Sequence, residues 1–362
     1  MKKCFRKLVS LVCASVLTVS MMSTYGTDVK ATTISGHELK NPVKEASNTE
    51  WDCVWFGSYP QAEVVPSSTF TAIDYDLLED GDIIVSEELY DKLIKAKDMD
   101  WNENGDINLD GTYYRRIKKS DATPCTVISS GPMGKVMTAY QWNSDSEYHY
   151  FKYEPIKWRV LNITGDVALL LADQGLDNPA ASKKVSYWNE SGVRAWLNGD
   201  SSDTFIKTAF SAAERAVIKT SQITENRTLL SDKIFLLSES DVINESYGFS
   251  NDDTSLDRAR WSRSSTFSKA MGTHINIEFK SIPYYGCSSW MLRSAKYNPE
   301  SRSGPANYQQ RCVGSMGNVV YTLPDYTKLS IGCNSVRPVL RLDVSASSRV
   351  CSYAGTVNSN SR

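Results

Sequence analysis

The chain has 362 residues, 41% of them apolar, and its 40 basic and 42 acidic residues give a formal net charge of −2. Without residues 1–31, 35 basic and 41 acidic residues remain. An acidic chain with interspersed charges lacks the basic footprint of proteins that bind nucleic acid or anionic lipid, so we expect neither as a partner.

The first segment has the pattern of a secretory signal peptide. Basic residues between Lys2 and Lys7 precede an apolar run, Leu8–Met22, and a small-x-Ala site at Val29–Ala31. The sequence therefore predicts a signal peptide over 1–31 and a secreted or cell-surface protein. An uncleaved N-terminal membrane anchor is the alternative. No later run is apolar over about 18 residues, so we expect no stable membrane insertion after cleavage.

Residues 32–147 precede the main body of the predicted domain. The polar stretch 32–50 is typical of a disordered leader, and structure is expected from Trp51 on. Residues 53–56 form a predicted strand, closed by a turn at 57–60. Residues 66–147 read as an insertion with a helix over 87–97 and an acidic hairpin over 105–117, turning at Asp110–Gly111.

The main body begins at Tyr148 and alternates strands with short helices. Strands are predicted over 156–161, 167–172, 234–237, 289–293, 318–321 and 336–342. Two short helices are predicted, one over 191–197 and one opening at Ser211 with a Ser-x-x-Glu capping box. Residues 244–283 are predicted to form a long polar loop, and the Ser-rich end, 345–362, a loose tail apart from Cys351.

Several segments together resemble a known family. They are Phe56-Gly-Ser-Tyr-Pro-Gln61, Pro155-Ile-Lys-Trp-Arg-Val-Leu161, Leu169-Leu-Leu-Ala-Asp173, Trp188-Asn-Glu-Ser-Gly-Val-Arg-Ala-Trp-Leu-Asn-Gly199, Asp232-Lys-Ile-Phe-Leu-Leu-Ser238, Trp290-Met-Leu-Arg-Ser294 and Val336-Arg-Pro-Val-Leu-Arg-Leu342. This set resembles a domain of unknown function common in exported proteins of Gram-positive bacteria, over about residues 52–344. That family has no established activity to carry over. One departure is Trp290-Met291, where the family often has Trp-Trp, so the second indole of a paired-indole site is missing here.

The C-terminal motifs, an aromatic-Leu-Arg-Ser strand, a variable loop and a Val-Arg-Pro strand, resemble the C-type-lectin-like fold. The resemblance implies a single α+β domain over 51–344, with mixed or antiparallel sheets, two short helices and long loops. Domains of that fold pair their first and last strands and bind ligands with long loops on one face.

Six cysteines follow residue 31, and an even number in an exported chain favours disulfides. They are Cys53, Cys125, Cys287, Cys312, Cys333 and Cys351. The absence of a Cys-x-x-Cys motif argues against a zinc ribbon or a thioredoxin-type site, and sequence alone does not choose the pairing. The fold resemblance implies Cys53–Cys351, since the first and last strands would adjoin. Cys312 and Cys333 flank the 318–321 strand, which leaves Cys125–Cys287.

No complete catalytic motif is present. His149 and His274 lack a recognisable nucleophile motif. Asp252, Asp253 and Asp257 could pair as glycosidase acids, but nearby arginines favour loop-ordering ion pairs. We therefore expect no catalytic residue.

Metal and cofactor sites are not indicated either. Residues 100–108 mimic a calcium loop, but position 12 is Gly111 where an acid is needed, so an Asx-rich hairpin is the preferred interpretation. Formylglycine-type oxidation would need two neighbouring reduced cysteines, and Cys287, Cys312 and Cys333 are 25 and 21 residues apart. We expect no metal and no cofactor.

The candidate ligand face consists of residues 244–288 and 295–317, because such long polar connections are usually functional or disordered. The candidate ligand-binding residues are Arg258, Trp261, Arg263, Tyr285 and Arg293, in which aromatic rings would stack on sugars and polar groups would bond hydroxyls. The preferred hypothesis is a binding module for a glycan or a surface protein. An enzyme acting on cell-wall or glycan substrate and a structural envelope protein without a small ligand are the alternatives.

Overall fold

The structure is a computed structural model that describes residues 33–68, 82–128, 136–138, 140–179, 186–277, 280–297, 308–321, 333–347 and 349–360. The chain divides into two units, Met1–Lys30 and Ala31–Arg362, and every described residue belongs to the second unit. The signal peptide expected over 1–31 therefore lies outside the described residues. Among the residues that are described, no helix has the length and apolar character needed to cross a membrane.

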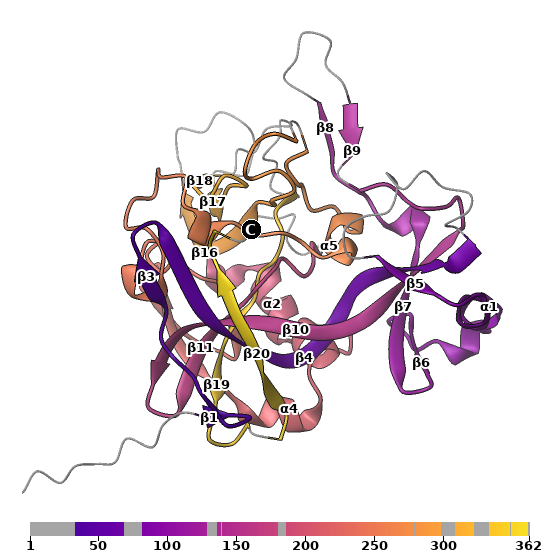
Figure 1. Cartoon of the computed structure of the whole chain (residues 1–362), viewed down its shortest axis with the longest axis horizontal. Helices are drawn as coiled ribbons and strands as arrows, with labels where there is room; N and C mark the ends of the chain where they lie inside the picture. Colours follow the sequence, from indigo (N-terminus) through magenta and orange to yellow (C-terminus); the bar gives the residue numbers. More distant parts are fainter. Residues whose placement is uncertain are drawn as a thin grey trace, which may run out of the picture. The chain divides into compact units, whose positions relative to one another are not determined.

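Eleven of the described strands form one sheet whose central path joins distant parts of the sequence (Figure 1). The path runs through β12 (Ile218–Lys219), β19 (Val339–Asp343), β11 (Val167–Ala172), β10 (Tyr148–Thr164), β4 (Asn48–Pro66) and β20 (Cys351–Asn358). All neighbours along it are antiparallel. β11 is a continuous apolar run because consecutive side chains, on both faces of the sheet, are buried. The first long strand and the last strand of the chain lie side by side.

β4 and β10 are much longer than the other strands and carry bulges. The prediction of a turn at 57–60 is wrong, because β4 continues through these residues. Between the pairs Trp55–Lys157 and Ser58–Pro155, two residues of β4 oppose one residue of β10. Gly57 takes a φ of 69° at this bulge, a conformation that glycine adopts without a steric penalty. The glycine therefore bends a strand here rather than ending it.

Within the expected insertion, 66–147, the described elements β5, α1, β6 and β7 lie at the outer ends of β4 and β10 (Figure 1). The elements of the insertion are β5 (Ile83–Val85), α1 (Glu87–Lys95), η3 (Asp98–Asp100), β6 (Asp106–Leu109), β7 (Thr112–Lys118), η4 (Lys119–Asp121), β8 (Thr126–Ile128) and β9 (Val136–Thr138). β5 is parallel to β4, and β7 is antiparallel to β10. A second apolar core includes Leu93 and Trp101. The predicted hairpin is confirmed, with positive φ at Asp110 and Gly111.

Short helices connect β11 to β12. They are η6 (Trp188–Glu190), α2 (Gly192–Asn198), α3 (Phe205–Ala209) and α4 (Ala212–Val217). The predicted helices correspond to α2 and α4, and the predicted capping box is confirmed. The Ser211 amide donates to Glu214 Oε2 at 2.7 Å, and the Glu214 amide donates to Ser211 Oγ at 3.3 Å. Phe210 is buried before this cap, with its ring 5.1 Å from that of Phe56, so the cap is fixed against β4.

The remaining elements form small sheets and the loop region. They are β13 (Ser221–Glu225), β14 (Thr228–Asp232), β15 (Ile234–Phe235), η7 (Glu245–Tyr247), η8 (Arg258–Arg260), α5 (Thr266–Ala270), β16 (Trp290–Tyr297), β17 (Tyr308–Val313) and β18 (Val319–Tyr321). β13 and β14 form a hairpin, and β16, β17 and β18 form a three-stranded sheet. Most pairings are antiparallel and five α-helices are present in the described residues. The expected α+β class with mixed or antiparallel sheets is confirmed at this level.

Both chain segments expected to be disordered contain strands. From residue 33 on, the leader expected over 32–50 forms β1 (Thr33–Ile34), β2 (His37–Glu38), β3 (Val43–Glu45) and the start of β4. Ile34 is buried in the main core. The tail expected to be loose over 345–362 contributes β20, which pairs with β4. Each segment is polar by composition, and its ordering comes from partners that are distant in the sequence.

Candidate functional site

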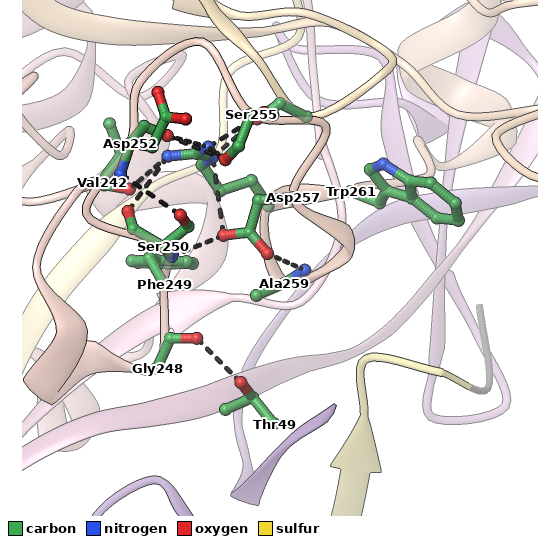
Figure 2. Close-up of polar contacts among 12 residues, drawn as sticks. Thr49, Val242, Gly248, Phe249, Ser250, Asp252, Ser255, Asp257, Ala259 and Trp261 are labelled. Atoms are coloured by element: carbon green, nitrogen blue, oxygen red, sulfur yellow. Dashed lines mark hydrogen bonds and ion pairs between the residues drawn. The ribbon is translucent and has the colours of Figure 1, made fainter. Parts of the chain in front are cut away.

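One buried arginine, Arg260 at the end of η8, organises the 242–257 loop. Figure 2 labels its loop partners Val242, Ser250, Asp252 and Ser255, which lie close together. The arginine side chain is fully buried. It donates to the main-chain carbonyls of Gly317 at 2.6 Å, Val242 at 3.1 Å, Ser250 at 3.4 Å, Asp252 at 2.7 Å and Ser255 at 3.1 Å, and to Ser255 Oγ at 2.8 Å. Asp257 Oδ2 lies 3.6 Å from its Nε. A buried charge is tolerated only with such partners, so Arg260 fixes the path of the loop.

Trp261 and Arg260 together hold the turn between β17 and β18. Trp261 Nε1 donates to the Met316 carbonyl at 2.8 Å, next to the carbonyl of Gly317 that accepts from Arg260. Gly317 has a φ of 89°, and a Cβ there would stand 2.2 Å from the Asp257 carbonyl oxygen. The turn therefore approaches η8 too closely for a side chain at Gly317. In their described parts, the two loops expected to share a face, 244–288 and 295–317, are therefore in contact at this turn.

A cavity of about 250 Å³ opens beside Trp261. Its lining residues are Asp173, Gln174, Trp261, Ser262, Arg263, Cys287 and Val357. These residues come from the end of β11, from the segment after η8, from the segment before β16 and from β20. The cavity thus combines a carboxylate, an amide, a hydroxyl and a guanidinium with an indole and an aliphatic side chain. We refer to it as the Trp261 pocket.

Two lining residues of the Trp261 pocket, Asp173 and Gln174, are held by side chains of the central sheet. Arg159, fully buried on β10, donates from Nε to Asp173 Oδ1 at 2.7 Å and from its terminal nitrogens to the carbonyls of Ala259 and Trp261. Gln174 Nε2 donates to Gln61 Oε1 at 2.7 Å. Arg159 therefore connects the central sheet directly to η8 and to the pocket. An arginine in this position can orient Asp173 as a hydrogen-bond acceptor.

The structure brings three of the five predicted ligand residues together. Arg258 is exposed and its guanidinium lies 5.4 Å from the centre of the Trp261 ring. Trp261 is only 4% exposed, so it lines a pocket and does not form an open stacking platform. Arg263 is exposed and lines the same pocket. Tyr285 is half-buried two residues before Cys287, a lining residue.

Arg293 lies in a different cavity. This second cavity, about 450 Å³, is lined by Thr224, Glu225, Asn226, Ser238, Glu239, Ser240, Ile243, Arg293 and Ser294. Arg293 Nε donates to Glu225 Oε2 at 3.1 Å, and its Nη1 donates to Asp241 Oδ2 at 2.8 Å and to the Leu236 carbonyl. Burial raises the pKa of Glu225, while a hydrogen bond from Arg311 lowers the pKa of Glu239. Arg293 braces β15 and the β13–β14 hairpin.

The acidic residues of the long loop cap turns. Asp252 Oδ1 accepts from the amide and the hydroxyl of Thr254, and Asp257 accepts from the Ser250 and Ala259 amides. These contacts support the interpretation of the loop acids as ordering groups.

The segment that mimics a calcium loop is an Asx-rich hairpin. Asn102 Oδ1 accepts from the amides of Asn104 and Asp106, each at 2.9 Å. Arg115 donates to both oxygens of Asp106, at 2.7 and 2.8 Å. A bidentate guanidinium satisfies the carboxylate that a cation would need. No group of three or more metal-ligating side chains suited to a metal occurs among the described residues.

The buried histidine of the main body takes part in a sealed contact. His149 Nδ1 lies 2.5 Å from Glu63 Oε1, between β10 and β4, and both side chains are 1% exposed. Burial lowers the pKa of His149 to about 4. Neither residue lines either of the two cavities described above.

The six cysteines are not joined as expected. The expected pairs are Cys53–Cys351, Cys312–Cys333 and Cys125–Cys287. No two of these six sulfurs, all in described residues, lie at disulfide-bonding distance. Cys351 is opposite Phe56, so it stands roughly 10 Å along the strands from Cys53, too far for a disulfide. Cys333 Sγ lies instead 2.8 Å from Cys125 Sγ, which contradicts the other two pairs.

Sequence reasoning missed four residues that build this site. Arg260 stands between two exposed arginines, Arg258 and Arg263, and no local pattern marks it as buried. Asp173 and Gln174 follow a predicted strand, a position that is a recognisable signal for site residues at strand ends. Val357 lies in the segment expected to be a loose tail. Only the pairing of β20 with β4 brings it to the pocket.

Comparisons with known proteins give one match, which covers the C-terminal part of the chain. Comparison with the curated proteins and with the solved structures gives no match. A family model matches residues 165–344, a range that contains every residue lining the Trp261 pocket except Val357. Over residues 165–344 the chain is therefore similar to the family described as Domain of unknown function (DUF6273).

Proposed function

We propose that this chain is an exported binding module that holds a hydroxyl-rich ligand, one unit of a glycan, in the Trp261 pocket. The observation that carries the proposal is the composition of the pocket: polar groups of four kinds converge beside an indole in a cavity of about 250 Å³. Binding sites are concave, with an apolar wall and a few placed polar groups. A cavity below the roughly 300–1,000 Å³ of drug-sized sites accommodates one ring or one side chain.

Pre-organisation of the pocket supports the same proposal. Arg159 orients Asp173 from the sheet, and Arg260 fixes the loop that leads into Trp261. A ligand that enters such a pocket loses little free energy to the ordering of loops. Carboxylate, amide and guanidinium groups held in place can bond several hydroxyls of a sugar at once.

The proposal includes a C-type-lectin-like architecture. Two features support it: the antiparallel pairing of the first long strand, β4, with the last strand, β20, and the gathering of the long loops around Arg260. Export through a signal peptide over 1–31 is part of the same proposal. It is tested by mass spectrometry of secreted material, which should begin near Thr32.

A glycan array probed with the secreted chain tests the ligand. Arg263→Ala should weaken binding of any glycan found by at least about tenfold, since a hydrogen bond to a charged group contributes about 1.5–3 kcal/mol. Arg349→Ala is the matched control, because Arg349 is exposed and precedes β20, at the end of the strand opposite Val357. Equal affinity of both variants and the parent chain would place the site elsewhere. If the chain binds a surface protein and retains no glycan on the array, its ligand is a protein and not a glycan.

A second candidate function, hydrolysis of a glycan, is favoured by one observation in the Arg293 cavity. Glu225 and Glu239 line that cavity, and the pKa of the first is raised while the pKa of the second is lowered. Acid and base pairs of glycosidases have such opposed shifts. The test is release of reducing ends from cell-wall glycan. Release by the parent chain that is lost in Glu225→Gln would support hydrolysis, and no release by the parent chain would reject it.

A further inference from the structure

Two cysteines from distant parts of the chain place their sulfur atoms against each other. Cys125 Sγ lies 2.8 Å from Cys333 Sγ, and the two residues are 208 positions apart in the sequence. Cys125 lies between η4 and β8, in the insertion, whereas Cys333 lies in the segment that leads to β19. The separation is shorter than that of two sulfurs in ordinary non-bonded contact and approaches the roughly 2.05 Å of a disulfide.

The surroundings of the pair suit a covalent link. A small apolar cluster contains Cys125, Cys333, Ile275 and Ile277, and in it only Cys125 and Ile275 are buried. So few buried side chains contribute little burial energy. The His274 amide donates to the Cys333 carbonyl at 2.8 Å, so the main chain holds Cys333 in position. The cluster therefore positions both thiols but does little by itself to keep these segments together.

We propose that Cys125 and Cys333 form a disulfide that fastens the insertion to the segment before β19. The oxidant is a low-molecular-weight disulfide. The thiolate of Cys333, the more exposed member of the pair, attacks one sulfur of the oxidant and expels a thiolate, which gives a mixed disulfide. The thiolate of Cys125 then attacks Cys333 Sγ and expels the second thiolate. Two protein thiols are oxidised, one small disulfide is reduced to two thiols, and the two protons pass to the released thiolates.

The other four cysteines are expected to remain thiols. Cys53, Cys312 and Cys351 lie on β4, β17 and β20 and are buried. Cys287 is buried in the wall of the Trp261 pocket. The proposal therefore predicts one disulfide and four thiols after residue 31, whereas three disulfides would leave no thiol there.

Peptide mapping of the unmodified secreted chain tests the link directly. The protein is equilibrated with oxidised glutathione, unfolded in denaturant with iodoacetamide and digested without reductant. The expected result is a cross-linked peptide pair that contains Cys125 and Cys333, and alkylated peptides for the other four cysteines. Alkylation of both Cys125 and Cys333, or a link from either one to a different cysteine, would overturn the proposal.

A thermal comparison tests whether the link stabilises the fold. Dithiothreitol should lower the Tm of the parent chain by roughly 5 °C, because reduction releases a long loop in the unfolded state. Cys125→Ser should show no such shift, while Cys312→Ala, which removes a buried thiol outside the pair, should keep it. A shift that persists in Cys125→Ser would show that another bond is being reduced. The peptide map of the parent chain remains decisive if a variant fails to fold.

Discussion

Replacement of Arg260 by lysine should destabilise the protein far more than the same replacement two residues earlier. The guanidinium makes six hydrogen bonds around the 242–257 loop. A lysine ammonium has three donors at one point, so at least three of these contacts are lost. At about 1 kcal/mol for each lost bond to a buried acceptor, Arg260→Lys should lower the free energy of unfolding by about 3 kcal/mol.

Arg258→Lys is the matched control, because Arg258 is exposed and its guanidinium donates to Asn360 Oδ1 over a long 3.5 Å. A change within about 0.5 kcal/mol is expected for it. Urea denaturation of both variants gives the free energies. Hydrogen exchange should show faster exchange in 242–257 and at the 314–317 turn for Arg260→Lys alone. Equal stability of the two variants, or unchanged exchange in both segments, would refute the role assigned to Arg260.

Three further predictions concern the core and a helix end. Burial raises the pKa of Asp177, the acceptor of a 2.5 Å hydrogen bond from Tyr59, to about 6, above its unfolded value of about 3.9. The folded state thus binds the extra proton between about pH 4 and pH 6 and loses stability as the pH rises through this window. Asp177→Asn should raise stability at pH 7.5 by up to about 3 kcal/mol and remove this slope in urea titrations; a destabilised variant at pH 7.5 would contradict it. Ser211→Ala removes the capping box with Glu214 and should cost about 1 kcal/mol by thermal unfolding, whereas Ser211→Asp should not. Leu93→Ala should cost about 2–4 kcal/mol and raise hydrogen exchange in the insertion first, because Leu93 belongs to the second core; uniform exchange across both cores would argue against that separation.

The sequence predicted those parts of the fold that local chemistry determines. Asp110–Gly111 supports a tight turn because both residues tolerate positive φ, and the β6–β7 hairpin follows from it. The Ser211 capping box locates α4 in the same way. Gly57 shows the limit of such local signals, because a glycine with positive φ occurs in turns and in β-bulges alike. Here the pairing of β4 with β10 makes it a bulge.

The site was predictable only in part, because its residues meet through long-range pairing. Arg263 and Trp261 were expected as ligand residues, and both line the Trp261 pocket. Val357 reaches that pocket because β20 pairs with β4 some 300 positions away, a contact that no local periodicity encodes. The cysteine pairs failed for the same reason, since the expected Cys53–Cys351 link depends on a strand register that the sequence does not specify.

Arg260 holds the 242–257 loop mainly through the loop's main chain and not through its side chains. Five of its six hydrogen bonds end on main-chain carbonyls, which every residue type supplies. A loop folded around calcium must instead keep its carboxylates. The exposed positions of the loop can therefore diversify on the same backbone, whereas Gly248, with a φ of 89°, and the buried Phe249 must be kept. The exposed positions of this loop are suited to engineering: new side chains at Glu245 and Ser246 should be presented on an unchanged backbone as long as Arg260 is retained.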